Sequence, residues 1–470
     1  MNEFSEENEN PEFAVKRFER MLRLNEQYYF DRDDLENIVE FYIHENHHQK
    51  ALKAIKFASG QYPDSTYFIL RKSQLMSADG QYEAALKLLD EIEIFEPGNP
   101  EIFVTRGGIY AMLGRPAEAI EAYKAALRID RRIEEIYLFI AFEFQNQSKY
   151  GKAARYLRRC LKLNPENESA LYEMSFCFDV TNKLEAGVKY FNSFLDEHPY
   201  SKVAWYALGH LHSKQQQYIP AIEAFDYATV IDETFASAWF NKGNCQAASE
   251  QYEQAIESYK EIFKLEEPDA MTFLYIGECY ENLDKYPEAL KYYQQASAMD
   301  EFLPDAWIGI GVVLDFLDRS NESLSYVKKG INLDPTRGTF WFILGDLQLK
   351  LGFVNEAEES YGKVLEFEPE NEDIWVFMCN LLLEQGRVDE AQTLMQECFK
   401  YHPGDARLTF QSCEVELHKG NLQEALMLAE IALATDPALG PKMQEELPRF
   451  GMNAQIAQLV ERYRDQEKND

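Results

Sequence analysis

Residues 304–345 read PDAWIGIGVVLDFLDRSNESLSYVKKGINLDPTRGTFWFILG, and a Trp followed four residues later by a Gly appears twice in this stretch, 34 residues apart. All tryptophans of the chain fall on one phase of this 34-residue period: Trp205, Trp239, Trp307, Trp341 and Trp375. Five chance placements would not share a phase. The chain is therefore a tandem array, and repeats have to be recognised before domains are counted.

Other columns follow once Trp is taken as position 4 of the repeat. Position 8 is Gly in six repeats, position 20 is Ala in ten, and position 32 is Pro in eight. This register runs from residue 66 to residue 439 without an insertion, as eleven repeats, and a weaker twelfth repeat precedes it at 32–65. We expect the Trp column, including Trp239 and Trp307, to be buried between adjacent repeats.

The columns predict pairs of helices. Positions 4, 7, 8 and 11 lie on one face of a first helix, and positions 20, 24, 27 and 28 lie on one face of a second helix. Small residues at positions 8 and 20 let the two helices approach closely. A Gly, Asn or Asp between the helices suits a helix C-terminus, and the Pro at position 32 ends the second helix. The sequence therefore predicts an all-α fold.

This pattern resembles the tetratricopeptide repeat family over residues 32–439. The resemblance implies a right-handed superhelical solenoid of about twelve helix-turn-helix repeats, with first helices lining a concave groove and second helices outside. Residues 1–10 are expected to form an acidic flexible tail, and residues 11–31 a leading helix. Residues 440–470 are expected to form capping helices that cover the last repeat, because one amphipathic stripe there contains Ile456, Leu459, Val460 and Tyr463.

The charge of the chain narrows the classes of partner. Its 47 Lys and Arg stand against 81 Asp and Glu, a formal net charge of −34. An excess of this size repels phosphate backbones and anionic membranes, so neither nucleic acid nor membrane is expected as a partner. No stretch of the sequence is long and apolar enough to span a bilayer, and the acidic start lacks the features of a signal peptide.

The sequence offers no constellation for catalysis. It has no phosphate-binding Gly-Lys-Ser/Thr loop, and Gly309 and Gly311 begin a dinucleotide-like pattern that Leu314 breaks. The seven cysteines are scattered over small repeat columns, which predicts packing in a reducing compartment rather than disulfides. His44 and His48 have helical spacing but no third ligand nearby. We therefore expect a cytoplasmic protein that is not an enzyme and has no metal and no cofactor.

The family resemblance implies that positions 2, 5, 9, 12 and 13 line the groove. In the central repeats these positions offer apolar and acidic side chains, and they hold few bases. The candidate partner-binding residues are Tyr206, Phe240, Asn244, Leu274, Glu278, Glu281, Asp315, Phe342 and Asp346. This lining predicts a protein or peptide partner with apolar and basic residues.

The preferred interpretation is a scaffold or adaptor that binds a peptide segment or a partner protein in the groove. A second interpretation is a regulatory or sensor subunit whose catalytic or DNA-binding output lies on another chain. A third is a self-assembling structural protein that associates through its terminal repeats. The chain carries neither the Lys and Asn pair typical of carboxylate-clamp repeats nor the Asn ladder of glycosyltransferase-linked arrays.

Overall fold

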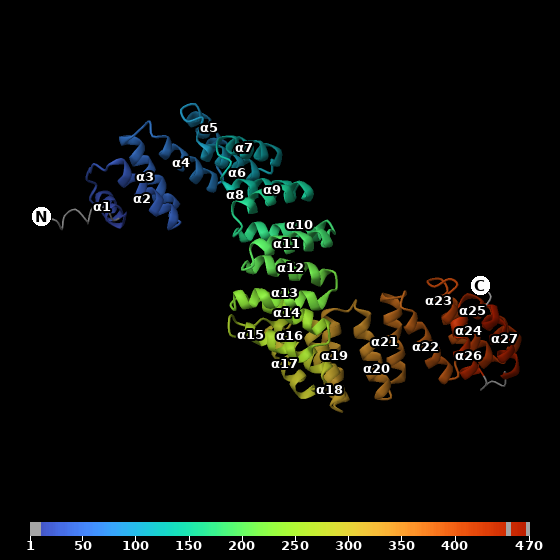
Figure 1. The fold of residues 1–470 in the computed structure, drawn as a ribbon. Coiled ribbons are helices and arrows are strands. Elements are labelled where there is room, and N and C mark those ends of the chain that lie inside the picture. Colours follow the sequence, from blue (N-terminus) through green and yellow to red (C-terminus); the bar gives the residue numbers. More distant parts are fainter. Residues whose placement is uncertain (1–10, 448–452, 467–470) are drawn as a thin grey trace. The chain divides into compact units, whose positions relative to one another are not determined.

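The computed structural model describes residues 11–447 and 453–466, which form helices and connecting turns without a strand (Figure 1). The expected tail at residues 1–10 lies outside this part of the chain. The first helices of the repeats are α2 Arg32–His44, α4 Thr66–Ala78, α6 Pro100–Met112, α8 Glu134–Asn146, α10 Glu168–Val180, α12 Lys202–Lys214, α14 Ala236–Ala248, α16 Ala270–Asn282, α18 Pro304–Phe316, α20 Gly338–Lys350, α22 Glu372–Glu384 and α24 Ala406–Lys419.

The second helices keep the same period. They are α3 His48–Gln61, α5 Tyr82–Glu93, α7 Pro116–Ile129, α9 Tyr150–Leu163, α11 Leu184–Glu197, α13 Tyr218–Ile231, α15 Tyr252–Ile262, α17 Tyr286–Met299, α19 Ser320–Leu333, α21 Val354–Phe367, α23 Val388–Cys398 and α25 Leu422–Thr435. The second helices other than α15 each pack against the first helix of their own repeat. The all-α fold of tandem helix pairs is thus confirmed.

The turn between the two helices has the same backbone conformation in every repeat. Its central residue has a positive φ in every repeat, and the chain places glycine at five of these positions. The other seven are Asn46, Ser148, Asn182, Gln216, Glu250, Asp284 and Asp318. A residue other than Gly is strained in this left-handed conformation, and among the other residues Asn and Asp are strained least. The repeat therefore imposes the turn even where the local sequence disfavours it.

Glycine at position 8 makes room for an aromatic ring from the second helix. A Cβ placed on Gly277 would lie 2.7 Å from the ring of Tyr293, and one on Gly243 would lie 2.6 Å from the ring of Tyr259. These distances are far below the ordinary contact of about 3.5–4.0 Å between carbon atoms. The predicted close approach at position 8 is therefore an approach of ring to backbone at five of the six glycines, and at Gly311 the approaching side chain is Val327.

The tryptophan column joins one repeat to the next through a hydrogen bond. In each case the indole N–H donates to the backbone carbonyl six residues earlier, at 2.8–3.0 Å. That carbonyl belongs to the last turn of the preceding repeat. The expectation that Trp239 and Trp307 are buried is wrong, because both are half-buried and only Trp375, at 3% exposure, lies inside a core. Trp375 makes the same hydrogen bond while buried, so this bond does not set the exposure of the indole ring.

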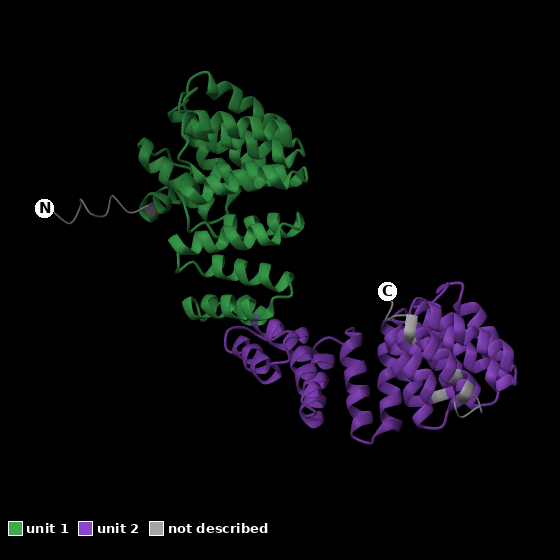
Figure 2. Cartoon of the chain, turned by 45° about the vertical axis from the view of Figure 1, so that its right-hand side comes forward, with its two compact units in different colours: residues 1–241 green, residues 242–470 purple. Residues whose placement is uncertain are grey.

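The chain divides into two compact units, residues 1–241 and 242–470 (Figure 2). In unit 1, a continuous core extends from Ala119 to Ala224, and the leading helix α1, Pro11–Leu24, buries Phe18 in a separate cluster with Phe30. In unit 2, helices α26, Gly440–Glu446, and α27, Asn453–Gln466, follow the last repeat after a short 3₁₀ turn at Pro437–Leu439.

Three members of the predicted C-terminal stripe join the core of the last repeat: Leu459, Val460 and Tyr463. This core also contains Leu433 and Phe410. The side chain of Ile456 lies outside the described residues.

Candidate functional site

The predicted site residues fall in both units and are described in each separately. Tyr206 and Phe240 belong to unit 1, whereas Asn244, Leu274, Glu278, Glu281, Asp315, Phe342 and Asp346 belong to unit 2. All nine lie on first helices.

In unit 1, Tyr206 of α12 is half-buried in an aromatic cluster. Its ring centroid lies 5.8 Å from that of Tyr172 and 5.1 Å from that of Phe235. The Tyr206 hydroxyl accepts a hydrogen bond of 3.1 Å from the Asn241 side chain. Phe240 is half-buried on α14. Both rings thus present one edge to solvent while the rest contributes to packing.

In unit 2, the apolar candidate Leu274 is not accessible to a partner. Leu274 is 3% exposed and packs in a core with Tyr293 and Ile310. Its assignment as a contact residue is therefore wrong, because neighbouring repeats close over position 5 there. Phe342 is half-buried, with its ring centroid 5.8 Å from that of Tyr361 and 6.0 Å from that of Phe377.

Three of the polar candidates accept a hydrogen bond from a tyrosine at position 24 of their own repeat. The donor and acceptor pairs are Tyr259 with Asn244 at 2.7 Å, Tyr293 with Glu281 at 2.6 Å, and Tyr361 with Asp346 at 2.6 Å. In all three repeats the ring reaches the first helix over the glycine at position 8. The phenol thereby fixes the position of a side chain on the first-helix face. The sequence contains both columns, but their contact was not anticipated.

Asp315 does not present an uncompensated charge. Its Oδ1 forms an ion pair of 2.9 Å with Nζ of Lys350 and accepts a hydrogen bond of 2.5 Å from Ser320. Lys350 is one of the few bases of the groove positions, and it comes from the following first helix. The acidic strip expected from the sequence is therefore interrupted at this residue.

Among the acidic candidates, Glu278 has the most strongly shifted pKa. Its side chain reaches solvent, yet the surrounding protein displaces part of its water. This desolvation, together with repulsion from Asp305 and Glu281, raises the pKa of Glu278 to about 7. Desolvation also raises the pKa of Glu281, although the hydrogen bond from Tyr293 opposes the shift. Asp305 itself forms an ion pair of 2.5 Å with Arg337.

An apolar stripe on α10 was missed by the sequence interpretation. Tyr172, Phe176 and Val180 follow one another at i, i+4 and i+8, and they are 39%, 47% and 47% exposed. This spacing places them along one side of the helix. The signal was present in the sequence, because Tyr172, Phe176 and Val180 occupy positions 5, 9 and 13 of one repeat. Phe176 also meets Tyr150 edge to face at 6.0 Å.

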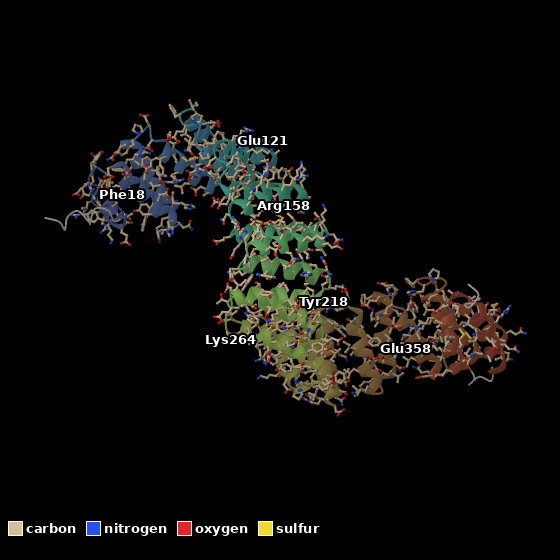
Figure 3. The ribbon with its side chains drawn as sticks, viewed as in Figure 1. Phe18, Glu121, Arg158, Tyr218, Lys264 and Glu358 are labelled. Atoms are coloured by element: carbon tan, nitrogen blue, oxygen red, sulfur yellow. The ribbon has the colours of Figure 1, made fainter. Side chains whose placement is uncertain are left out.

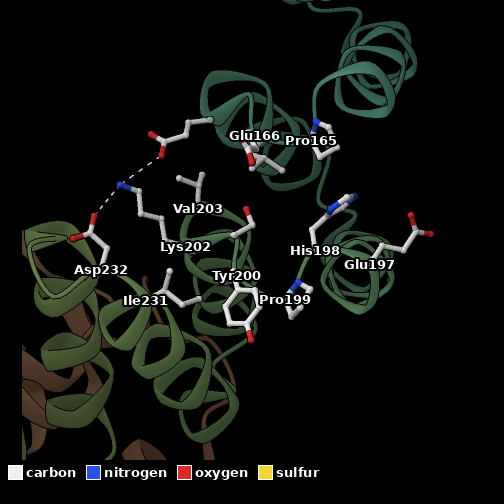
Figure 4. Close-up of a pocket in the computed structure, with 13 residues that line it drawn as sticks. Pro165, Glu166, Glu197, His198, Pro199, Tyr200, Lys202, Val203, Ile231 and Asp232 are labelled. Carbon is white, nitrogen blue, oxygen red and sulfur yellow. Dashed lines mark hydrogen bonds and ion pairs between the residues drawn. The ribbon is translucent and has the colours of Figure 1, made fainter.

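A cleft of about 680 Å³ lies at the N-terminal ends of α10 and α12 in unit 1 (Figure 4). Nζ of Lys202 lies 2.8 Å from a carboxylate oxygen of Asp232 and 3.5 Å from one of Glu168. The hydrogen bond from Lys202 lowers the pKa of Asp232 to about 2. The cation of this cleft is therefore already compensated, and none of the predicted site residues lines the cleft.

The cysteines lie where the repeat columns predict. All seven are buried and outside any disulfide, and burial raises the pKa of Cys160 and Cys177 to about 11 and that of Cys279 to about 12. A neutral, enclosed thiol is a packing group. Over the described ranges, no three His, Cys, Asp or Glu side chains are grouped as ligands for a metal ion. No helix within the described part of the chain has the length and apolar character needed to cross a membrane.

Comparison with known proteins gives a consistent result for the repeats. Family models described as tetratricopeptide repeat match residues 100–133, 134–167, 206–265, 240–304 and 348–409.

Two curated proteins share part of the array. The general transcriptional corepressor trfA of Dictyostelium discoideum is 26% identical over 139 residues, which cover 29% of this chain and 10% of that protein. The human protein O-mannosyl-transferase TMTC3 is 24% identical over 144 residues, covering 30% of this chain and 15% of that protein. The chain thus spans a small part of the length of these relatives.

Solved structures with similar helix pairs include YrrB, described as a TPR protein with an unusual peptide-binding site. It is 20% identical and covers 39% of this chain and 94% of its own, with a TM-score of 0.33. The Cut9–Hcn1 hetero-tetramer of APC/C provides a chain that is 15% identical and covers 86% of this chain and 93% of its own, with a TM-score of 0.40.

Proposed function

Because this chain belongs to the tetratricopeptide repeat family, we propose that it is a non-enzymatic scaffold or adaptor whose first helices bind a segment of a partner protein. Its helix pairs form a fold suited to protein–protein interaction. The seven buried cysteines, none of them in a disulfide, support a reducing, cytoplasmic location.

The observation that carries the proposal is the exposed stripe of Tyr172, Phe176 and Val180 on α10. Single apolar side chains are common on protein surfaces, but a contiguous group marks an interaction site. The stripe is continued by Tyr206 on the next first helix, whose ring lies 5.8 Å from that of Tyr172. An apolar segment of a partner would bury these side chains, with a gain of about 25 cal/mol per Å² of apolar surface removed from water.

Unit 2 adds an electrostatic preference to the proposed function. Glu278 forms no ion pair within the described residues, and desolvation, followed by repulsion from Asp305 and Glu281, raises its pKa. A Lys or Arg of the partner placed beside Glu278 would stabilise the ionised carboxylate and lower that pKa. Binding of a basic segment should therefore strengthen as pH rises through about 7, because the free protein then no longer has to release a proton.

The apolar part of the proposal can be tested in unit 1. Proteins captured from a native lysate by the full chain are identified by mass spectrometry, and each is titrated against Phe176→Asp/Val180→Asp. The matched control is Ile219→Asp/Val230→Asp, which changes two exposed apolar residues of the second helix α13 by the same charge. We expect the first pair to weaken binding at least about tenfold and the control less than about twofold. Equal effects would refute a first-helix site.

The acidic part is tested with the same partner. Glu278→Lys/Glu281→Lys should weaken binding and flatten its salt dependence. Glu257→Lys/Glu359→Lys, which reverses two exposed acids on second helices of unit 2, should do neither. If the first pair retains both affinity and salt dependence while circular dichroism shows it folded, the acidic contact is wrong. Sedimentation that depends on protein concentration would instead favour self-assembly.

A further inference from the structure

The second helix α9 carries a run of positive charge that contrasts with the rest of the chain. Between Glu143 and Glu166 the sequence contains no Asp or Glu, although acids outnumber bases 81 to 47 overall. The same segment contains six bases, all of them exposed: Lys149, Lys152, Arg155, Arg158, Arg159 and Lys162. The repeat columns do not predict this segment, because its bases lie outside the positions that define the repeat.

Four of these bases form a stripe. Lys152, Arg155, Arg159 and Lys162 are spaced i, i+3, i+7 and i+10, which places them along one side of α9. Ten residues of helix rise about 15 Å, so the stripe covers about three turns. Because α9 is a second helix, the stripe is separate from the first-helix residues of the proposed function.

Aromatic rings pack against the guanidinium groups of Arg159, which belongs to the stripe, and of Arg158, which lies next to it. Arg158, labelled in Figure 3, lies over the ring of Tyr190 on α11 at 5.4 Å, and Arg159 lies over the ring of Tyr156 at 5.5 Å. Stacking orients a guanidinium group without consuming its five donors. These arginines therefore remain able to form bidentate hydrogen bonds with carboxylates.

The positive charges of α9 have no carboxylate partners in the described structure. None of the six bases forms an ion pair there, whereas exposed arginines elsewhere do, as Arg115 does with Glu118 and Arg319 with Glu322. Lys183 and Lys189, at the start of α11 and within it, are also exposed and form no ion pair among the described residues. Like charges three or four residues apart on a helix destabilise it slightly. A negatively charged ligand would remove this repulsion.

We propose that the basic face of α9, formed by Lys152, Arg155, Arg158, Arg159 and Lys162, binds a short acidic segment of a partner protein. Charge complementarity selects an acidic ligand, and the 15 Å stripe matches about three turns of an acidic helix. The net charge of −34 favours a short segment over nucleic acid, because an extended polyanion would run beyond the stripe onto a negatively charged surface. The scaffold thereby holds two partners, one on first helices and one on α9.

The proposal is tested by fluorescence anisotropy with the full chain and a labelled helical peptide of roughly 15 residues, about 22 Å long. The peptide carries four Glu at the spacing of the stripe, and a second peptide carries Gln at the same places. We expect the Glu peptide to bind and the Gln peptide to bind at least about tenfold more weakly. Affinity for the Glu peptide should fall as salt rises.

The variant Arg155→Glu/Arg159→Glu should weaken binding of the Glu peptide at least about tenfold. Its matched control is Lys53→Glu/Lys56→Glu on the second helix α3, because these exposed lysines also form no ion pair in the described structure and the net charge changes equally. The control should weaken binding less than about twofold. Circular dichroism checks folding, and Arg155→Gln/Arg159→Gln, with a smaller expected loss, replaces the reversal if the reversal unfolds the chain.

Three results would overturn the proposal. Equal weakening by the variant and its control would show that net charge alone governs binding. Tighter binding of a single-stranded oligonucleotide than of the Glu peptide, lost in the variant, would identify a nucleic-acid surface. Sedimentation showing self-association that disappears in the variant would identify a second copy of this chain as the acidic partner.

Discussion

Substituting alanine for the glycine at position 8 should have the opposite effect from the same substitution at an open position of a helix. Gly277 of α16 is the test position, and Gly362 of α21 is the control. A Cβ at Gly277 would lie 2.7 Å from two ring carbons of Tyr293, which is 2% exposed and cannot swing away. A Cβ at Gly362 would have nothing within 4 Å. Both glycines lie inside helices and have no positive φ.

The two effects can be separated in magnitude. Alanine is favoured over glycine in a helix interior by about 1 kcal/mol, and this gain applies to both variants. Overpacking against Tyr293 should cost about 1–3 kcal/mol, and this cost applies only to Gly277→Ala. We therefore expect Gly362→Ala to stabilise by up to about 1 kcal/mol. Gly277→Ala should be the less stable of the two variants by about 1–3 kcal/mol.

Hydrogen exchange measured by mass spectrometry suits this comparison, because a repeat array opens locally rather than as one unit. Amides of α16 and α17 should exchange faster in Gly277→Ala, by about tenfold for each 1.4 kcal/mol of lost local stability. Amides of α21 should exchange more slowly in Gly362→Ala. If both variants shift protection in the same direction and by similar amounts, glycine at position 8 is not required by the packing of Tyr293.

The remaining predictions concern the Trp column, the turn, the salt dependence and Glu278. Trp375→Ala should lower the free energy of unfolding by about 3–5 kcal/mol. Trp375→Phe should lower it by about 1 kcal/mol, because the hydrogen bond to the Pro369 carbonyl is lost. Trp307 is half-buried, so Trp307→Ala should lower it less than Trp375→Ala in the same denaturation series. Glu250→Gly should stabilise by about 1 kcal/mol, because φ there is +63°, and a lower melting temperature would contradict this. The wild-type melting temperature should rise from 0.01 to 0.1 M ionic strength as the screening length falls from about 30 to about 10 Å, whereas a flat trend would mean that paired charges dominate. Folding raises the pKa of Glu278 from 4.5 to about 7. The native state is therefore destabilised progressively as pH rises from about 4.5 to about 7, because Glu278 ionises less readily when folded. Glu278→Gln should raise the melting temperature at pH 8 and leave it unchanged at pH 4.

The sequence alone was sufficient to predict the helix pairs and their period. Gly, Ala and Pro at fixed columns determine where helices approach and end, and these are local or nearest-neighbour effects that repeat every 34 residues. For the same reason the observed first helices begin at residues 66, 100 and 134, in the predicted register. The cysteines could also be assigned to packing, since they occupy small-residue columns, and all seven are buried.

The tertiary structure alone decided which groove residues are available to a partner. Leu274 is enclosed by neighbouring helices, and Asp315 is neutralised by Lys350, 35 residues further along the chain. The hydroxyl of Tyr361 reaches Asp346 only because the ring crosses Gly345. Each outcome depends on the distance between side chains of different helices. A column pattern specifies which residues share a face, but solvent exposure and charge compensation depend on how adjacent helices pack.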